Sequence, residues 1–426
     1  MQALMEHVGE SVSRAFGPGQ RALGPTDLRL ARLREGMEGP VTLLLQRYQN
    51  LLPSWNSSRR KDLEAPLEKD GLVQVWRVRG TVLVLEISDK ALVSYCLRDS
   101  TSSHDKSKTD WKLTLTSPPD ARTYLYVKAV TSPSPLRRKE GDIHMGVYTH
   151  DPRGFRPFQD YPSMGSSMTH VDLAKCFSSA IGSSSSSNGT YTPPSPCSSS
   201  LFLVDQSPGG NAWMRQWNSV KESDVNYDKP ESWVVFGPCP YSPEDLEGMV
   251  RKMASEELPA SCSEWLDPRQ AKEACWICAW TSLTFSFLSP RLTLPMHVDF
   301  SKMARERPGV IIRSSEEEGV PKEPTDEGLI ALVTTMSPES RVLCARLLLL
   351  QDHLVQQARS PVAFTPSALT QNMTRLARAV TRAQYTLRVK GTERALASAR
   401  LALLIRTKQC LAQGLELLGL PALEYM

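Results

Sequence analysis

The feature that most constrains the fold is a row of apolar residues near the C-terminal end of the chain. Its members recur at alternating spacings of four and three residues: Leu369, Met373, Leu376, Val380, Ala383 and Leu387. An α-helix turns about once every 3.6 residues, so this spacing gathers them on one side of a helix. A helix with one apolar side buries that side against other helices. The sequence therefore predicts a helical bundle at this end.

Two neighbouring segments have the same character. One begins at Ser337-Pro338-Glu339, which combines a capping side chain, a proline in the first turn and an acid near the positive end of the helix dipole. The other begins near Thr392. Prolines at 361 and 366 separate the first helix from the second. Three helices with short connections predict an antiparallel bundle over residues 325–426.

The same region concentrates positive charge. Ten of the 50 basic residues and one of the 46 acidic residues lie between 359 and 408, whereas the rest of the chain holds 40 basic and 45 acidic residues. At about 100° per residue, Arg375, Arg378 and Arg382 fall opposite the apolar row. Arg388, Lys390 and Arg394 follow in the next turn and helix start. These six residues are the predicted nucleic-acid-binding site.

Guanidinium groups repeated at helical spacing suit phosphates, which they bind with two hydrogen bonds. Tyr385 is the one aromatic residue between Arg375 and Arg394, so base stacking is not the evident mode. We expect contacts with the backbone of RNA or DNA that do not depend on base sequence. An anionic membrane surface fits almost as well, and a solvated arginine face of an ordinary bundle explains the pattern equally simply.

The first half of the chain has a different pattern. Residues 1–66 are expected to form helices, with a break at Gly39-Pro40. From 67 to 179 the sequence predicts an antiparallel β domain, a small sandwich or barrel. Its expected strands are short and rich in Val, Leu, Thr and Tyr, and they cover 72–80, 81–89, 91–97, 111–117, 122–130 and 142–150.

A serine-rich segment at 180–200 is expected to be a flexible linker or exposed loop. Thr192-Pro193 and Ser195-Pro196 within it are possible targets of proline-directed phosphorylation, although an unmodified tether is the simpler reading. Residues 201–324 mix expected strands at 201–205 and 231–238 with helices at 243–258 and 268–288. The predicted fold class is α+β, with a β-rich N-terminal half, a mixed middle and the basic bundle at the end.

Cysteine usage indicates reduced thiols. The chain has nine cysteines without a repeating framework, as is typical of an intracellular protein. The single C-x-x-C, Cys275 to Cys278, lies in an apolar stretch with two tryptophans. Zinc motifs usually present cysteines from glycine-rich turns, so we expect a buried helix without a metal ion, even though Cys262 and His297 would complete a set of four ligands.

The sequence offers weak support for catalysis. His104, Asp105 and Asp110 share one loop, and a second group contains His144, His150 and Asp151. Polar surface loops that take no part in catalysis contain the same residue types, so these groups do not indicate an active site. Phosphate-binding, dinucleotide-binding, metalloprotease and nucleophile-elbow motifs are all missing from the sequence. We therefore predict no catalytic residues, no cofactor and no small-molecule substrate.

These observations lead to one functional prediction and its alternatives. The N-terminus lacks the pattern of a secretory signal, and the longest apolar run, 274–288, is too short for a confident membrane span. The expected protein is intracellular, in the cytoplasm or nucleus, and non-enzymatic. It would contact nucleic acid through its basic helical face and other proteins through its body, as a viral nucleocapsid, matrix or movement protein does. The alternative is an interaction scaffold or adaptor for an acidic protein or a membrane surface, and an enzyme without a recognisable motif is the third class.

Overall fold

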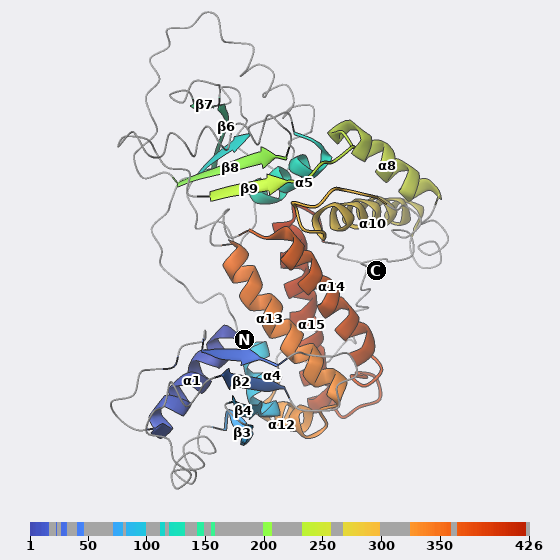
Figure 1. Ribbon diagram of the computed structural model, residues 1–426. Helices are drawn as coiled ribbons and strands as arrows, with labels where there is room; N and C mark the ends of the chain where they lie inside the picture. The colour runs from blue at the N-terminus through green and yellow to red at the C-terminus, as the bar shows by residue number, and fades with distance from the viewer. Residues whose placement is uncertain are drawn as a thin grey trace, which may run out of the picture. The chain divides into compact units, whose positions relative to one another are not determined.

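A computed structural model describes residues 1–16, 23, 27–31, 41–46, 71–79, 82–98, 111–115, 119–132, 143–148, 155–157, 199–206, 232–256, 267–298, 324–358 and 364–422 (Figure 1). The chain forms two compact units. Unit 1 comprises Met1–Ser102, Val310–His353 and Asn372–Leu411, and unit 2 comprises Ser103–Gly309, Leu354–Gln371 and Ala412–Met426. The chain therefore crosses between the two units five times and ends in unit 2.

Unit 1 contains a four-stranded antiparallel sheet in the order β1-β2-β4-β3. Its strands are β1 (Leu28–Leu30), β2 (Thr42–Gln46), β3 (Val73–Arg79) and β4 (Val82–Ile87). In β2, Leu43 and Leu45 are fully buried, whereas Leu44 between them is only half-buried. This period of two is what a sheet with one covered face requires. Helix α1 (Gln2–Phe16) and helix α4 (Asp89–Leu97) belong to the same unit.

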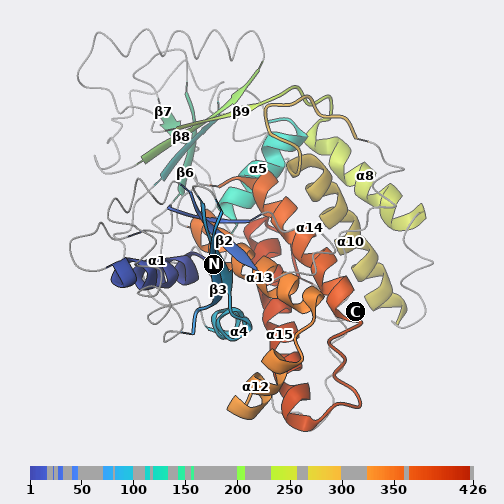
Figure 2. The same cartoon turned by 60° about the horizontal axis from the view of Figure 1, so that its bottom comes forward.

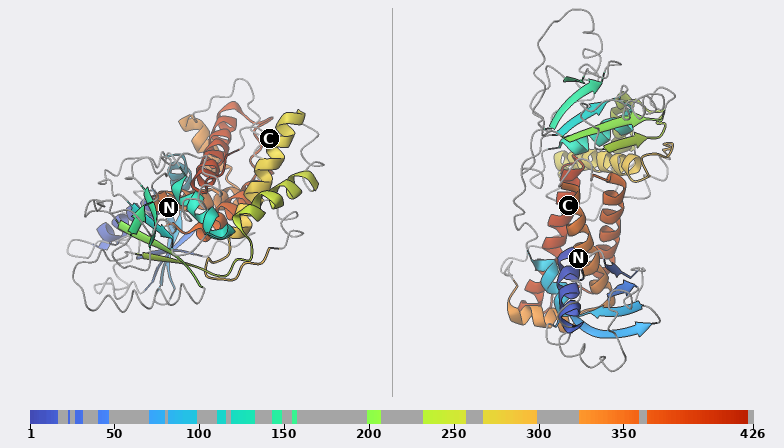
Figure 3. Two further views of the ribbon diagram at one scale, coloured as in Figure 1. Left: turned by 90° about the horizontal axis from the view of Figure 1, so that it is seen from above. Right: turned by 60° about the vertical axis from the view of Figure 1, so that its left-hand side comes forward.

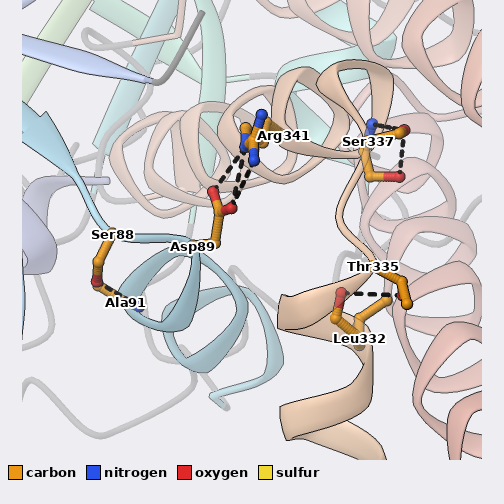
Figure 4. Close-up of polar contacts among 8 residues, drawn as sticks. Ser88, Asp89, Ala91, Leu332, Thr335, Ser337 and Arg341 are labelled. Carbon is orange, nitrogen blue, oxygen red and sulfur yellow. Dashed lines mark hydrogen bonds and ion pairs between the residues drawn. The ribbon is translucent and has the colours of Figure 1, made fainter. Parts of the chain in front are cut away.

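An ion pair fixes α4 to the bundle helix α13 (Pro338–Ala358), as Figure 4 shows. Arg341 Nε lies 2.8 Å from Asp89 Oδ1, and Arg341 Nη2 lies 2.8 Å from Oδ2 of the same carboxylate. The neighbouring Ser88 Oγ accepts a hydrogen bond from the Ala91 amide and caps α4. A two-pronged arginine–carboxylate bond fixes orientation as well as distance, so α4 is held at its first turn.

Unit 2 contains a five-stranded sheet in the order β7-β6-β5-β8-β9. The strands are β5 (Trp111–Leu115), β6 (Ile143–Tyr148), β7 (Phe155–Pro157), β8 (Ser199–Asp205) and β9 (Ser232–Phe236). The pairs β5–β6, β5–β8 and β8–β9 are parallel, and only β7 is antiparallel to its neighbour. Parallel neighbours need crossover connections, and helix α5 (Ala121–Thr131) lies in the one between β5 and β6.

Three helices accompany this sheet within unit 2. Helix α8 (Pro243–Glu256) lies beside α10 (Pro268–Leu288) in Figures 1 and 2. Asp267 caps α10 by accepting hydrogen bonds from the Arg269 and Gln270 amides. The guanidinium of Arg122 on α5 is completely buried, and all its hydrogen-bond partners are backbone carbonyls of residues 287–294. Arg122 thereby joins α5 to the end of α10.

The C-terminal helices are confirmed. Helices α13, α14 (Pro366–Ala383) and α15 (Arg394–Leu417) lie side by side in Figures 1 and 3. Every member of the apolar row is buried, with Leu369, Leu376 and Val380 at 0% exposure. A short helix, α12 (Asp326–Thr334), precedes them and is capped by Thr325, whose Oγ1 accepts from the Gly328 amide. A mixed α/β chain with a C-terminal helical part is therefore correct as a coarse description.

The predicted helix near residues 28–52 is wrong in its described part. Residues 28–30 and 42–46 are strands that pair with each other, Leu28 with Leu45 and Leu30 with Leu43. Leu43, Leu44 and Leu45 form a short continuous apolar run, and the period of such a run alone cannot distinguish a strand from a helix. The second neighbour of β2, strand β4, pairs with it along its whole length, and this pairing makes residues 42–46 a strand.

Two predicted strands, 91–97 and 122–130, are helices. Their signal of Val, Leu and Tyr is misleading because α4 and α5 are buried on most sides, and such helices have no polar face to reveal the helical period. The caps were the better guide: Ser88 starts α4, and Asp120 Oδ1 accepts from the Thr123 amide 2.7 Å away at the start of α5. The antiparallel sandwich or barrel is not confirmed, since most of the second sheet is parallel.

Some predictions lie outside the described residues. These are the serine-rich linker up to residue 198, the phosphorylation targets and the loops that hold His104 and His150. Ser199 and Ser200, at the end of the predicted linker, belong to β8. The predicted domain boundaries at 66, 179, 200 and 324 stay a prediction.

A glycine at the start of α12 gives a testable packing prediction. A Cβ built on Gly328 would lie 2.3 Å from the Ala395 carbonyl oxygen and 2.9 Å from its carbon. Because this neighbour is backbone, Gly328→Ala should lower the free energy of unfolding by about 1–3 kcal/mol, as measured by urea denaturation. Gly248→Ala in α8 is the matched control. Nothing lies within 4 Å of its Cβ position, so alanine should stabilise that helix by up to about 1 kcal/mol. Equal stability gains in both variants would contradict this close packing.

Candidate nucleic-acid interface

The six predicted site residues are all exposed on unit 1. They are named the basic face here and comprise Arg375, Arg378, Arg382, Arg388, Lys390 and Arg394. The first three follow one another at spacings of three and four on α14, so they share one side of this helix. The buried apolar row occupies the opposite side. The structure therefore confirms the exposure of the predicted site residues, while their role in binding is a separate question.

The connection from α14 to α15 is built so that its basic side chains point outward. Leu387 and Val389 are buried, whereas Arg388, which lies between them, and Lys390, which follows them, are exposed. Val389 packs with Ala397 and Leu401 of α15 in a small apolar cluster. Because Leu387 and Val389 are buried, the residue that follows each of them is left exposed, and this packing holds Arg388 and Lys390 on the surface.

Hydrogen bonds stabilise the same connection. Arg400 Nη1 on α15 donates to the Arg388 carbonyl oxygen over 2.7 Å. Thr392 Oγ1 donates to the Val389 carbonyl oxygen over 2.7 Å, and Gly391 has φ +77°, a conformation that favours glycine. Burial lowers the pKa of Arg400. The sequence pattern left the role of Arg400 open, whereas the structure shows that it fixes the backbone of the basic connection.

Tyr385 is the most exposed large hydrophobic residue among those described, at 77%. It lies between Arg382 and Arg388 in sequence, directly after the end of α14. Exposed aromatic rings surrounded by positive charge are how many proteins stack unpaired bases while neutralising phosphates. The sequence pattern does not reveal this exposure, so a single aromatic residue among the arginines gave little indication of base stacking.

The parallel sheet of unit 2 supplies a second place of interest, which the sequence analysis missed. From β5 the chain moves through α5 to β6 on one side, and later enters β8 on the other side of β5. Ligands of open parallel sheets bind beyond the carboxyl ends of the strands at such a reversal. Here the described groups include Asp205 at the end of β8 and the Asp120 carboxylate at the start of α5.

The start of α5 has an acidic character. The Asp120 carboxylate takes the position that an anion occupies at many helix N-termini, and burial raises its pKa. The residue before it is Pro119, which has no backbone N–H to donate. Any phosphate at this turn would have to compete with the Asp120 carboxylate for the helix N–H groups.

The described residues contain no arrangement typical of a metal site or a membrane-spanning helix. The C-x-x-C motif lies in α10, as predicted, with Cys275 buried and Cys278 half-buried. Among the described residues, no three His, Cys, Asp or Glu side chains are arranged to hold a metal ion. None of the helices described is both long and apolar enough to cross a membrane. Of the residues that offered weak support for catalysis, His144 lies on β6, and His104, Asp105, Asp110, His150 and Asp151 lie outside the described part of the chain.

The basic face lies in a part of the chain that matches a known RNA-binding domain type, and the whole chain resembles two solved structures. Residues 303–426 match the model of the DALR anticodon binding domain. A search of curated proteins gives no match. Two solved structures share the fold. Arginyl-tRNA synthetase from Thermus thermophilus has a TM-score of 0.61 and 14% sequence identity, and the match covers 99% of this chain and 100% of that one. Arginyl-tRNA synthetase from Plasmodium falciparum has a TM-score of 0.57 and 10% identity, and the match covers 100% of this chain and 98% of that one.

The predicted class of protein is corrected by this comparison. The expectation of a non-enzymatic, viral structural protein is contradicted, because residues 303–426 match an anticodon binding domain and both of these similar structures are arginyl-tRNA synthetases. The prediction that no small molecule is bound conflicts with the same finding, since such synthetases select amino acids. RNA as the partner class agrees with the anticodon-binding match. The chain thus has a fold similar to that of two arginyl-tRNA synthetases, and its residues 303–426 match a DALR anticodon binding domain.

Proposed function

We propose that this protein binds tRNA through its basic face. The observation that carries the proposal is that residues 303–426, which match an anticodon binding domain, contain all six basic-face residues, and each of these is exposed. The arginines of α14 would neutralise phosphates of the tRNA backbone. Arg388, Lys390 and Arg394 would continue this contact along the connection to α15.

Tyr385 is the group in this face best suited to a base. RNA is recognised mostly in its loops, where unpaired bases stack on aromatic side chains. The ring is 77% exposed and follows directly on the arginine row of α14. We assign to Tyr385 the stacking of one unpaired base of the anticodon loop.

The tRNA class follows from the two solved structures, both of which are named as arginyl-tRNA synthetases. Arginine-accepting tRNA is therefore the substrate class that we assign. Fluorescence anisotropy at one fixed salt concentration should show tighter binding of this tRNA than of aspartate-accepting tRNA. Equal affinity for both would remove the specificity from the proposal, and weak binding of both would contradict tRNA binding itself.

Replacing Tyr385 tests the base contact separately. Tyr385→Ala should weaken tRNA binding by about tenfold, because stacking on an aromatic ring contributes about 1–3 kcal/mol per base. Tyr385→Phe keeps the ring and should bind as the wild type does. Gln384→Ala changes the exposed neighbour and serves as the matched control. An alanine variant with unchanged affinity would show that the ring does not contact the RNA.

Aminoacylation is the second candidate function, and the extent of the fold likeness favours it. The likeness covers 99% of this chain and so includes the parallel sheet, not only the anticodon-binding part. The direct assay is ATP-dependent attachment of labelled arginine to its tRNA. Charging above the background without protein would support the ligase reaction. Binding of the same tRNA without charging would leave tRNA binding as the function.

A further inference from the structure

Strand β3 is an exposed edge of the sheet in unit 1. Among the described strands it pairs only with β4, at the end of the order β1-β2-β4-β3. Two of its large apolar side chains are exposed, Val75 at 45% and Val78 at 39%. An edge strand presents backbone N–H and C=O groups with which another strand can pair.

The exposure of β3 extends to both of its faces. Val75 is opposite Glu86 and Arg77 is opposite Val84, whereas Val78 is opposite Leu83. Val75 and Arg77 therefore point to one face, and Val78 points to the other. A partner docked on a single face would leave the other apolar side chain in water. A strand added along the edge flanks both faces with its own side chains.

Charge decides which strand the edge accepts. Arg77 and Arg79 are exposed, and Arg77 Nη2 lies 2.6 Å from Glu86 Oε1 on β4. Pairing with a second copy of β3 would bring arginines close to arginines, which is unfavourable. An acidic strand would meet them with opposite charge. The register irregularity between Val73 and Val75 leaves residues 75–79 as the regular part of the edge.

We propose that the β3 edge, residues 75–79, is a docking site for an extended acidic segment of a partner protein. The segment adds as a fifth strand of the sheet. It alternates Asp or Glu with β-branched residues, so that its carboxylates lie on the face of Arg77 and Arg79 and its apolar side chains lie on the opposite face, over Val78. The backbone hydrogen bonds supply affinity, and the two arginines supply selectivity.

Synthetic peptides provide the test. The probes are labelled peptides of about ten residues that alternate glutamate with valine or threonine, and a matched set has lysine in place of glutamate. Binding to the full chain is followed by anisotropy, and amide hydrogen exchange locates the site. The acidic peptides should bind and slow exchange across residues 75–79, whereas the lysine peptides should do neither.

Two variants and a control connect binding to this edge. Arg79→Glu should weaken the acidic peptides about tenfold. Val78→Ser removes an exposed apolar group, should leave the sheet folded and should weaken the same peptides. The matched control is Arg29→Glu on β1, an exposed arginine at the opposite edge of the same sheet, which should change the affinity less than twofold.

Three results would overturn the proposal. One is that none of the acidic peptides binds or protects residues 75–79. Another is that Arg29→Glu weakens binding as much as Arg79→Glu, because the effect would then follow net charge alone. The last is that a single-stranded RNA oligonucleotide protects β3 and the peptides do not, which would make this edge a nucleic-acid surface.

Discussion

Replacing Arg122 by methionine should lower the free energy of unfolding by about 3–5 kcal/mol. The side chain is completely buried, and its five N–H groups donate to five carbonyl oxygens, those of Phe287, Pro290, Arg291, Leu292 and Leu294, at 2.8–3.0 Å. Methionine fills a similar volume but donates no hydrogen bond. The carbonyls would lose their donors inside the protein, and each buried group left unpaired costs about 1–3 kcal/mol unless water reaches it.

The end of α10 adds to this effect. Phe287 lies in the last turn of α10, and the other acceptors follow its end, so a buried cation there also interacts favourably with the helix dipole. The measurement is urea denaturation of the full chain, combined with hydrogen exchange across residues 287–294. Arg291→Ala is the matched control: its side chain is exposed and its carbonyl is kept. A methionine variant as stable as this control would show that the carbonyls find other donors.

Replacing Arg375, Arg378 and Arg382 together by glutamine should weaken tRNA binding about 100-fold at low salt. Each arginine that contacts a phosphate displaces about one counterion, so the slope of log affinity against log salt should fall by about 0.7–0.9 per arginine removed. Glutamine keeps the helix propensity of α14. Because the three side chains are exposed and the apolar row is untouched, folding should hardly change.

The control for this variant removes the same amount of charge elsewhere. Lys252, Arg269 and Lys272 are exposed on α8 and α10 of unit 2, and their replacement by glutamine should leave the salt slope nearly unchanged. An unchanged slope in the α14 variant, with normal circular dichroism, would mean that the arginines are only solvated. An unfolded α14 variant would mean that they stabilise the fold, contrary to their exposure.

The candidate site was accessible to sequence analysis because it depends on a helical period. The spacing from Leu369 to Leu387 places the apolar residues and the arginines on opposite sides of α14, and neither assignment needs a tertiary contact. The identity of the partner was not accessible in the same way. A row of exposed arginines suits RNA, DNA and lipid head groups alike, and it was the anticodon-domain match that favoured tRNA.

Much of the N-terminal half was not accessible. Residues 122–130 contain Tyr124, Tyr126 and Val127, which favour a strand by propensity, yet they form the buried helix α5. A short segment that is apolar on all sides adopts the structure that its neighbours complete, because packing outweighs differences in propensity of a few tenths of a kcal/mol per residue. The same reason explains β1 and β2, whose leucines pair across the sheet.

The sequence by itself determined the three C-terminal helices, the charge on α14 and the cap at Ser337, because each of these depends on residues within one or two helical turns. Only the tertiary structure decided that β5, β6, β8 and β9 form a parallel sheet, that Arg122 is buried rather than exposed, and that Tyr385 is exposed. These outcomes depend on contacts between residues far apart in the chain. Arg122 meets its acceptors about 165 to 172 positions further along, a distance over which local periodicity carries no information.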